Sequence, residues 1–368
     1  MYTKNPTGVG IYIREVWNNL YKKLDAEQVE YVCYTYQMEQ LNKCNKLSVI
    51  KLPFALQYLL NRLISLHRLI WNLFYLPFVA KKYDLIYSFS SHGSPFIKNQ
   101  IITIHDLVCF NFPEQHRFQF LYFKYIMPYI IKTSKKIVVI SQFTKSEVIK
   151  RYKVDPDKLI VILNGGDHLK HAGTFILSKE EKKLEEQISG KRFFLTVGAS
   201  YPHKNIERLI EAVNQAPVKS SLVIIGAVNK YYNKLRKFAA QKNISNIIFM
   251  EYVSPDFLNL LYKKCIANVY ISFHEGFGFP PFEAAINNKV SIVANSGALT
   301  EIYSDAVYYV NPFSIKEISD ALTLMASSHF NHCEYQKKFP QLIEKNTWIK
   351  TSDEIAELIL TQANHVLI

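Results

Sequence analysis

The sequence is poor in cysteine, and none of its cysteines forms a CxxC pair. The five that it contains are Cys33, Cys44, Cys109, Cys265 and Cys333. An odd number without paired spacing argues against a disulfide framework or a zinc site and favours reduced thiols in the cytoplasm. The sequence also lacks a signal-peptide pattern and an uninterrupted apolar run of about 18 residues, the length of a transmembrane helix. We therefore expect a cytoplasmic protein that is able to contact a membrane.

Acidic residues are fewer than basic ones, 31 Asp and Glu against 44 Lys and Arg, which gives a formal net charge of +13. A charge of this sign favours an acidic partner: a nucleic acid, an anionic membrane or a phosphorylated substrate. No nucleic-acid recognition motif accompanies the charge, so we expect no nucleic-acid partner. With 368 residues, of which 49% are hydrophobic, the chain is long enough for two domains with sizeable cores.

Strand patterns alternate with helical patterns, without internal repeats or low-complexity segments. The strand patterns form two series, one at 29–36, 84–90, 100–106, 135–141 and 158–164, and one at 192–198, 221–226, 246–252, 268–273, 290–295 and 306–311. Between them lies helical spacing, as in NIERLIEAVN (205–214), whose apolar residues share one face. This alternation predicts parallel sheets with right-handed crossovers, hence an α/β chain of two Rossmann-like domains. We place the linker near 165–173, in a polar and charged stretch.

The stretch HEGFGFPPFEAA, from His274 to Ala285, places two glutamates around a Gly-Phe-Gly-Phe run and a proline pair. It follows the predicted strand 268–273, and proline is favourable at the first helical position, so the proline pair marks the start of a helix. Glu275 then lies in the loop at the carboxyl end of a strand, where open α/β sheets bind ligands. Glu283 lies in the first helical turn. A structural alternative is that Glu283 only complements the helix dipole.

A second loop of this kind is VGASYPHKNIERLIEA, from Val197 to Ala212. A strand ends in Gly198, a short polar loop follows, and a helix begins near Asn205. Lys204 would lie beside free backbone amides at the helix start, a place suited to a diphosphate. The structural alternative is a surface lysine near a turn, because the order strand, glycine, loop and helix recurs throughout α/β domains.

Taken together, these segments resemble retaining glycosyltransferases of the GT-B fold, family 4. HEGFGFPPFEA is similar to the Glu-x7-Glu motif of that family, and it is the specific part of the match. The likeness covers nearly the whole chain in the expected order, through TGVGIYIREVWNNL (7–20), IITIHDLVCFNFPE (101–114), VVISQFTKSEVIKRYKV (138–154), LIVILNGGD (159–167), VGASYPHKN (197–205) and SGALTEIYSDAVYYVNP (296–312). The N-terminal pieces are individually weak.

The resemblance implies a GT-B fold of two Rossmann-like domains that face a central cleft. Residues 1–168 would form the acceptor-binding domain and 169–348 the domain that binds the nucleotide-sugar. Residues 349–368 would form a helix that crosses back to pack on the N-terminal domain, with Trp348 near the crossover.

The resemblance also implies roles for residues of the C-terminal domain. Glu275 would contact the donor sugar, Glu283 would hold the ribose hydroxyls, and Lys204 would neutralise the leaving diphosphate. The implied donor site comprises Gly198, Lys204, Asn205, Glu275, Gly276, Phe277, Gly278, Phe279 and Glu283. The family commonly has an arginine just after the loop glycine, where this chain has Ala199. His203 or another basic residue would then share the load, or the diphosphate would be bound more weakly.

On the N-terminal side, the resemblance implies an acceptor site that comprises Gly8, Gly10, His105 and Asp106. His105 matches a histidine that faces the donor sugar and the acceptor, so the implied catalytic residues are Glu275, His105 and Lys204. The alternatives are a structural histidine at 105, a helix-capping aspartate at 106, and a simple turn and cap at TGVG.

The family retains anomeric configuration without an evident covalent nucleophile. The usual proposal is a front-face mechanism in which the leaving phosphate takes the acceptor proton. The two glutamates of the motif are therefore not assigned as a glycosidase acid and nucleophile. The resemblance implies no cofactor, and we expect no metal, since no metal-ligand cluster stands out.

Two segments, 46–83 and 117–136, are rich in aromatic and basic residues, and the stretches KLSVIKLPFALQYLLNRLISLHRLIWNLFYLPFVAKKY and RFQFLYFKYIMPYIIKTSKK contain no Asp or Glu. Such helices suit the surface of an anionic bilayer, where a lipid-linked saccharide acceptor would lie. The alternative is that both are ordinary domain helices with solvated lysines. We expect a peripheral protein on the cytoplasmic face of the inner membrane.

One feature departs from the family pattern. Only MYTKNP precedes the TGVG segment, whereas a Rossmann-like domain has a strand there. We therefore expect the first strand to be missing or atypical, in which case the N-terminal sheet would lose a paired neighbour. This feature is the main argument for an alternative class, a nucleotide-sugar-binding or assembly protein that does not catalyse.

The spacing VGxxxPxKN and the GVG-type start look most like bacterial mannosyl- and rhamnosyltransferases of surface polysaccharide synthesis. The predicted reaction moves a hexose from a nucleotide-sugar donor, GDP-mannose in first place, to a lipid-linked or growing O-antigen, capsule or exopolysaccharide. UDP- or dTDP-linked rhamnose, glucose or galactose are the alternative donors.

Overall fold

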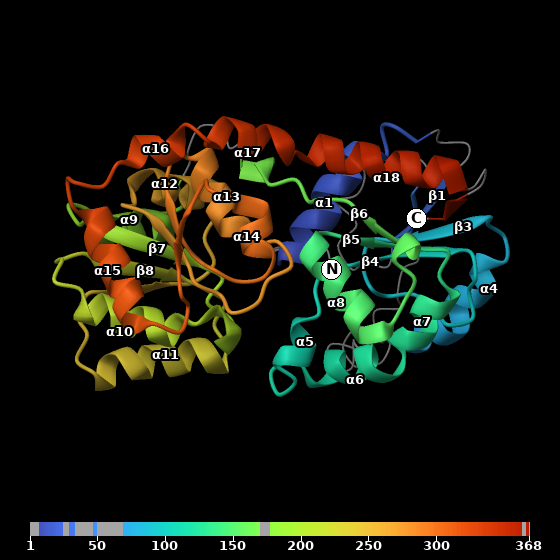
Figure 1. Ribbon diagram of the computed structural model, residues 1–368, viewed down its shortest axis with the longest axis horizontal. Helices are drawn as coiled ribbons and strands as arrows, with labels where there is room; N and C mark the ends of the chain where they lie inside the picture. Colours follow the sequence, from blue (N-terminus) through green and yellow to red (C-terminus); the bar gives the residue numbers. More distant parts are fainter. Residues whose placement is uncertain are drawn as a thin grey trace. The chain divides into compact units, whose positions relative to one another are not determined.

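The computed structural model describes residues 7–24, 29–33, 47–49, 69–169, 177–362 and 366–367 (Figure 1). The chain forms two compact units. The first unit comprises Met1–Gly165 together with Trp348–Ile368, and the second unit comprises Gly166–Thr347. The sequence predicts domain boundaries after residues 168 and 348. In the structure, the chain passes between the two units after residues 165 and 347.

The sheet of the first unit is parallel. Its described strands are β1 (Val29–Cys33), β2 (Leu47–Val49), β3 (Leu85–Ser88), β4 (Gln100–Ile104), β5 (Lys136–Val139), β6 (Leu159–Val161) and β13 (Val366–Leu367). Their order across the sheet is β2-β1-β13-β3-β4-β5-β6. All five residues of β4 and the last three of β5 are buried. Burial of this kind is typical of parallel strands that are covered on both faces.

Helices connect these strands. Those described in the first unit are α1 (Gly8–Leu20), the π-helix η2 (Trp71–Tyr75), α4 (Leu76–Ala80), α5 (Val108–Asn111), α6 (Arg117–Tyr125), α7 (Met127–Thr133), α8 (Gln142–Tyr152), the 3₁₀-helix η3 (Pro156–Lys158) and α18 (Trp348–Gln362). Local sequence sets both ends of α8. The Ser141 side chain accepts a hydrogen bond from the Thr144 amide at its start, and Lys153 ends it in the left-handed conformation with φ of 52°.

The C-terminal segment belongs to the first unit. Helix α18 packs along α1 (Figure 1), where Lys23 forms an ion pair with Asp353. The Thr351 hydroxyl donates to the Leu163 carbonyl at 2.8 Å. Strand β13 follows α18 and pairs in parallel with β1 on one side and β3 on the other. Strand β13 therefore fills the place between β1 and β3, so that both strands have a paired neighbour there. The residues MYTKNP lie outside the described part of the chain.

The sheet of the second unit is also parallel. Its strands are β7 (Phe193–Val197), β8 (Ser221–Ile225), β9 (Ile247–Met250), β10 (Asn268–Tyr270), β11 (Ser291–Ala294) and β12 (Tyr308–Val310). Their order is β12-β11-β10-β7-β8-β9. After β9 the chain crosses to the other side of β7, so the strand order reverses between β7 and β10. Open α/β sheets bind ligands at this point, outside the carboxyl ends of the strands.

The helices of the second unit follow the predicted alternation. Those described are η4 (Asp167–Leu169, 3₁₀), α9 (Lys179–Ile188), η5 (Pro202–Lys204, 3₁₀), α10 (Ile206–Gln215), α11 (Lys230–Gln241), α12 (Pro255–Lys264), α13 (Phe279–Ile286), α14 (Ala298–Tyr303), α15 (Ile315–Ala326), α16 (His332–Gln336) and α17 (Phe339–Lys345). The apolar face predicted in 205–214 is confirmed, because Ile206, Leu209, Ile210 and Val213 are buried.

Every predicted strand has a counterpart in the structure. The sequence patterns do not indicate β2, which has three residues, or β13, which has two. Among the helices that the structure describes, none combines the length and the apolar character needed to span a bilayer.

Candidate active site

The two loops singled out in the sequence meet where the strand order of the second unit reverses. Gly198 follows β7 with φ of 91°, and η5 leads to Asn205 (φ 62°), after which α10 begins. The other loop, 271–278, follows β10 and ends at Gly278, just before α13. Because β7 and β10 are paired in parallel, their carboxyl ends lie at the same edge and bring the side chains of the two loops together.

Lys204 and Glu275 join these loops. Lys204 Nζ lies 2.5 Å from Glu275 Oε1 and 2.9 Å from the Tyr270 hydroxyl. The ammonium also lies over the Tyr270 ring, 5.1 Å from its centroid. Only 17% of the Lys204 side chain and 13% of the Glu275 side chain are exposed. The alternative of a surface lysine near a turn is therefore wrong for Lys204.

The electrostatics of this pair keep Glu275 ionised. Burial acts to raise the pKa of Glu275, but the charges of Lys204 and His203 and hydrogen bonds from Lys204 and Ser272 lower it below its usual value. At neutral pH Glu275 is therefore a carboxylate that two basic side chains surround.

His203 is the second basic residue of the site. Its side chain is buried, and its carbonyl accepts hydrogen bonds from the Phe273 amide at 2.9 Å and the Ser272 hydroxyl at 3.1 Å. These bonds tie η5 to the loop after β10. Ala199, at the position where an arginine was expected, is fully buried. That His203 shares the load with Lys204, or that the diphosphate is bound more weakly, stays a prediction.

Glycine is required at positions 278 and 198 for different physical reasons. Gly278 has φ of 83°, and a Cβ there would lie 2.7 Å from Leu299 Cδ2 and 3.0 Å from Tyr270 Cε1. Neither the conformation nor the space at Gly278 admits a side chain. A Cβ at Gly198 would meet no atom within 4 Å, so φ alone requires glycine at that position. Gly276 and Phe277, between Glu275 and Gly278, are buried.

Glu283 does not lie in the first helical turn, so that prediction is wrong. Helix α13 already begins at Phe279, after the cap residue Gly278, and the proline pair lies inside its first turn. Glu283 is thus the fifth of eight residues, where the helix dipole does not favour a carboxylate. Its two oxygens have separate partners. Oε1 lies 3.0 Å from His168 Nε2, and Oε2 accepts a hydrogen bond of 2.7 Å from the Tyr262 hydroxyl.

Asn205 and Phe279, also predicted at the donor site, have structural contacts. Asn205 Nδ2 donates to the carbonyls of Ile271 and Pro312 at 3.2 and 2.7 Å. These hydrogen bonds connect the start of α10 to the loops after β10 and β12. The Phe279 ring packs edge-on against His168 with centroids 5.4 Å apart. Direct contact of these two residues with a donor stays a prediction.

Three predicted acceptor residues lie at helix starts in the first unit. Gly8 and Gly10 belong to the first turn of α1, and the side chain of the cap residue Thr7 makes no capping hydrogen bond. TGVG therefore forms the start of α1, and an acceptor-binding role for Gly8 and Gly10 stays a prediction. Asp106 lies just before the cap residue Leu107 of α5, and its Oδ1 accepts a hydrogen bond of 3.1 Å from the Val108 amide. An acceptor-binding role for Asp106 stays a prediction.

His105 follows β4 and is held by its neighbours. Its Nε2 lies 2.9 Å from the Phe89 carbonyl, so Nε2 carries a hydrogen and Nδ1 of the neutral ring is an acceptor. Burial lowers the pKa of His105, against the opposing effects of this hydrogen bond and of Asp106. The Tyr12 ring packs edge-on at 4.7 Å and lies 6.0 Å from the Trp348 ring. His105 is therefore a neutral imidazole in an aromatic setting.

Comparison with known proteins identifies the family. The model described as Glycosyltransferase Family 4 matches residues 6–168, and the model described as Glycosyl transferases group 1 matches residues 178–341. The two matches follow one another along the chain and cover most of both units. The chain belongs to glycosyltransferase family 4.

Curated relatives of this family 4 protein include two from enteric bacteria. The chain is 32% identical over 232 residues to the O-antigen chain mannosyltransferase RfbU of Salmonella typhimurium, a match that spans 63% of this chain and 62% of the relative. It is 24% identical over 249 residues to the O-antigen chain mannosyltransferase B of Escherichia coli, with 64% of each chain covered. The matches thus span less than two thirds of these relatives.

Solved structures agree with the GT-B fold of family 4. Anabaena Alr3699/HepE, crystallised in complex with UDP-glucose, matches with a TM-score of 0.71 at 15% identity, over 98% of this chain and 97% of that one. At this identity the likeness concerns the fold, two Rossmann-like domains with parallel sheets.

The sequence patterns do not single out three residues of the candidate site in this family 4 chain. His168 lies in the stretch read as a linker, Tyr262 in the middle of α12, and Tyr270 at the end of β10. Only three-dimensional neighbours distinguish them. Glu283 is an indirect signal for two of them, since a buried carboxylate requires hydrogen-bond partners, here His168 and Tyr262.

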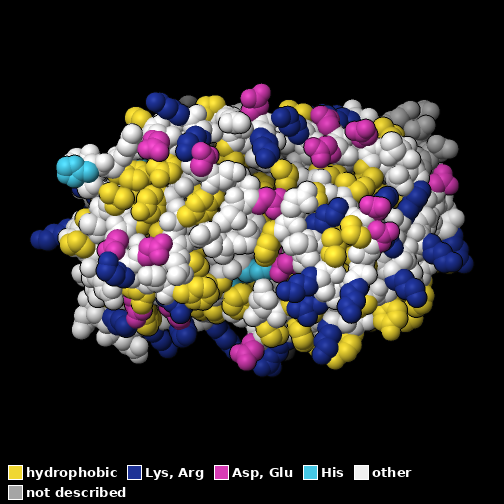
Figure 2. All heavy atoms as spheres, viewed as in Figure 1, with side chains coloured by type: hydrophobic (Ala, Val, Ile, Leu, Met, Phe, Trp, Pro, Cys, Tyr) yellow, Lys and Arg dark blue, Asp and Glu magenta, His cyan; other side chains and the backbone are white. Residues whose placement is uncertain are grey.

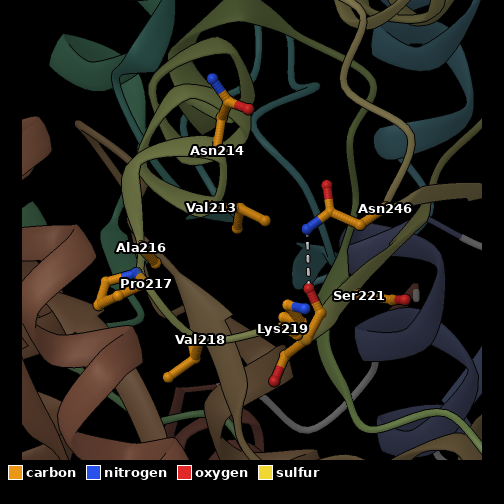
Figure 3. Close-up of a pocket in the computed structure, with 9 residues that line it drawn as sticks. Val213, Asn214, Ala216, Pro217, Val218, Lys219, Ser221 and Asn246 are labelled. Atoms are coloured by element: carbon orange, nitrogen blue, oxygen red, sulfur yellow. Dashed lines mark hydrogen bonds between the residues drawn. The ribbon is translucent and has the colours of Figure 1, made fainter.

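A shallow cavity of about 310 Å³ elsewhere in the second unit is unrelated to this site (Figure 3). The end of α10, residues 216–221 and Asn246 line it, and Asn246 Nδ2 donates to the Ser220 carbonyl at 2.9 Å. These segments lead into the amino ends of β8 and β9, whereas Lys204 and Glu275 follow the carboxyl ends of β7 and β10. Within the described residues, no group of three or more His, Cys, Asp or Glu side chains could hold a metal ion.

Proposed function

We propose that this protein transfers a hexose, with mannose as the first candidate, from a nucleoside diphosphate sugar to a lipid-linked or growing bacterial surface polysaccharide. The observation that carries the proposal is the ion pair between Lys204 and Glu275, which lies where the strand order reverses in a family 4 chain. A cation for the diphosphate and a carboxylate for the sugar are the charges that such a transfer requires side by side.

The proposed chemistry follows from these charges. When the bond between sugar and phosphate breaks, negative charge builds on the diphosphate and positive charge on the sugar ring. Lys204 would stabilise the first and Glu275 the second. Their mutual contact of 2.5 Å compensates both charges until the diphosphate takes over the interaction with Lys204. The anomeric configuration would be retained, and the leaving phosphate would take the proton from the hydroxyl of the acceptor saccharide. Neither Glu275 nor Glu283 would act as a nucleophile.

Mannose is the first candidate because the curated relatives from Salmonella typhimurium and Escherichia coli are named as mannosyltransferases of O-antigen chains. GDP-mannose is accordingly the first donor to test. UDP- and dTDP-linked sugars are the comparison donors. A binding protein that does not catalyse would take up a nucleotide-sugar without releasing a nucleotide in the presence of acceptor.

A thermal-shift panel of GDP, UDP and dTDP and their sugars tests the donor, because a ligand that binds only the folded state raises the melting temperature. We expect a shift with GDP compounds that is reduced in Glu283→Ala. Lys219→Ala, an exposed lysine of the unrelated cavity, is the matched control and should keep the full shift. A shift with UDP or dTDP compounds alone would mean that the donor is a UDP- or dTDP-linked sugar and not GDP-mannose. No shift with any nucleotide would overturn the proposed function.

We also propose that the protein works at an anionic membrane surface. In the first unit the described parts of 46–83 and 117–136 expose large apolar side chains, Phe74, Tyr75, Phe78, Phe118, Leu121, Tyr125 and Tyr129. Hydrophobic and basic side chains lie interspersed on the part of the surface where Figure 1 has α6 and α7 (Figure 2). Lys124 lies over the Phe120 and Tyr125 rings, at 5.6 and 5.2 Å. Aromatic rings and lysines together suit the interface of an anionic bilayer. Side chains of 46–68 lie outside the described residues.

Co-sedimentation with anionic vesicles at low salt tests this second proposal. The double variant Phe118→Ser, Tyr129→Ser should bind less than the wild type. Phe313→Ser removes a side chain of the second unit that is 66% exposed, against 80% for Phe118, and should bind as the wild type does. A wild type that stays in solution would overturn the membrane proposal and leave the proposed transfer reaction unaffected.

A further inference from the structure

We propose that His168 and Tyr262 clamp the Glu283 carboxylate so that the donor site selects ribonucleotides over 2′-deoxyribonucleotides. The inference rests on the proposed function, in which Glu283 holds the ribose hydroxyls of the donor. His168 and Tyr262 are positioning residues in this account, since they act on the ligand through Glu283.

The clamp is built from three separate elements of the second unit. His168 belongs to η4, Tyr262 to α12 and Glu283 to α13, and both η4 and α12 pack against α13. Only 3% of the His168 side chain and 6% of the Glu283 side chain are exposed, and Tyr262 is fully buried. Each carboxylate oxygen has its own partner, at 3.0 and 2.7 Å. The carboxylate cannot rotate without losing one of these hydrogen bonds.

The position of His168 is fixed by its surroundings. Two residues before it, the Gly166 amide donates to the Asn346 carbonyl at 3.1 Å, and a Cβ at Gly166 would lie 2.3 Å from the Phe282 ring of α13. The Phe279 ring packs edge-on against His168 itself. The backbone and the ring that carry Nε2 are therefore both held against α13.

The protonation of the two partners matches the clamp. A carboxylate is an acceptor only, so His168 Nε2 carries the hydrogen of this contact. Burial, and then the charge of Glu283, raise the pKa of the Tyr262 hydroxyl well above its usual value. Tyr262 is therefore a neutral phenol that donates its hydrogen to Glu283.

A fixed carboxylate discriminates between sugars. An ionised carboxylate offers roughly four acceptor positions, two on each oxygen. The clamp uses one position on each oxygen and leaves one on each, in a fixed plane, for two neighbouring hydroxyls. A ribose supplies both, whereas a 2′-deoxyribose supplies one. A lost hydrogen bond to a charged group corresponds to roughly tenfold or more in affinity. The clamp therefore favours GDP- and UDP-sugars over dTDP-sugars.

Calorimetric dissociation constants for GDP and 2′-deoxy-GDP test the clamp, with UDP and 2′-deoxy-UDP as a second pair that keeps the base constant. We expect the wild type to prefer the ribonucleotide by about tenfold or more. Glu283→Ala and His168→Leu should bring the ratio close to one, and His168→Gln, whose amide can donate, should restore part of it. A purely structural His168 would change the melting temperature and leave the ratio unaltered.

Tyr262→Phe gives an independent result that holds even where His168→Leu does not fold, because it removes one hydroxyl and keeps the ring. It should lower the ratio. Tyr232→Phe is the matched control, since Tyr232 is also fully buried and its hydroxyl donates to the Met250 carbonyl at 2.7 Å. The inference is overturned by a wild-type ratio near one. It is equally overturned by a preference that Glu283→Ala abolishes but the His168 and Tyr262 variants keep. A wild type that binds no nucleotide would instead show that the proposed function is wrong.

Discussion

Lys204 Nζ and Glu275 Oε1 lie 2.5 Å apart although 71 positions separate the two residues in the sequence. Lys204 follows β7 and Glu275 follows β10, and these strands are neighbours only because the chain crosses the sheet after β9. Tyr270, the last residue of β10, adds a hydroxyl 2.9 Å from the same ammonium. The topology of the sheet, more than local sequence, therefore creates the charge pair on which the proposed function depends.

Replacement of Lys204 by alanine should lower kcat for sugar transfer by roughly 100-fold or more, because the variant loses a preplaced charge on the leaving diphosphate. The KM for the donor should change less, since the charge on the phosphate grows in the transition state. Steady-state release of nucleoside diphosphate in the presence of acceptor measures both parameters.

The control for this variant is Lys219→Ala, which changes the net charge equally at an exposed position beside the unrelated cavity. It should keep the wild-type kcat. If Lys204→Ala also kept at least half of the wild-type kcat, Lys204 would not be the cation that stabilises the leaving group.

Stability should depend on pH through Glu275. Burial acts to raise the pKa of Glu275, but Lys204 and His203 lower it below the ordinary value of 4.5. As the pH falls, the unfolded chain takes up a proton at this position before the folded one does. The contribution of Glu275 is therefore complete above pH 4.5 and is lost as the pH falls through the lower pKa of the folded state.

The melting temperatures of the wild type and Glu275→Gln, measured from pH 7 down to pH 3, report this contribution. We expect the difference between them to be largest near neutral pH and to shrink below pH 4.5. A difference that stays constant over the whole range would contradict the ionised pair. Glutamine is a suitable replacement because it keeps the size of the side chain and one acceptor oxygen while it removes the charge.

Gly278→Ala should destabilise the protein more than Gly190→Ala does. Both glycines have positive φ, 83° and 68°, so alanine is strained at either position by about 1 kcal/mol. Only at 278 would the new Cβ also meet Leu299 Cδ2 at 2.7 Å, whereas nothing lies within 4 Å at 190. Overpacking should add about 1–3 kcal/mol.

Urea unfolding gives both free energies, and nucleotide-induced thermal shifts give the effect on the site. Gly278→Ala moves the loop that carries Glu275 and should weaken nucleotide binding, whereas Gly190→Ala should leave it unchanged. An equal loss of stability in both variants would mean that Gly278 is required for its backbone conformation alone.

The sequence predicts most of the fold because parallel strands buried on both faces appear as apolar runs. Strands such as β4, with every residue buried, are evident without a structure. Strand β13 is not evident from the sequence, since its two residues form a strand only by pairing with β1 and β3. The position of Glu283 in α13 was misjudged for a local reason. Proline is tolerated throughout the first turn of a helix, so the proline pair does not fix the residue at which the helix begins.

The site was predictable only in part. The loops after β7 and β10 were evident from glycines, prolines and charges at strand ends, and both contribute to the Lys204 and Glu275 pair. The partners of Glu283 were not, because His168 and Tyr262 come from elements more than 20 residues away in sequence. Hydrogen-bond partners of this kind leave no periodic pattern in a sequence.

Val366→Pro should destabilise the first unit and spare the second. Val366 pairs with Val29 of β1 and Leu85 of β3, so β13 is an interior strand. Proline removes the backbone N–H and is confined to edge strands, and an unpaired buried backbone group costs about 1–3 kcal/mol. Hydrogen exchange at the β1 and β3 amides should therefore accelerate, whereas nucleotide binding by Gly166–Thr347, a separate compact unit, should persist. Val366→Ile keeps the N–H and should exchange as the wild type does. Wild-type exchange in Val366→Pro would mean that β13 does not hold this sheet together.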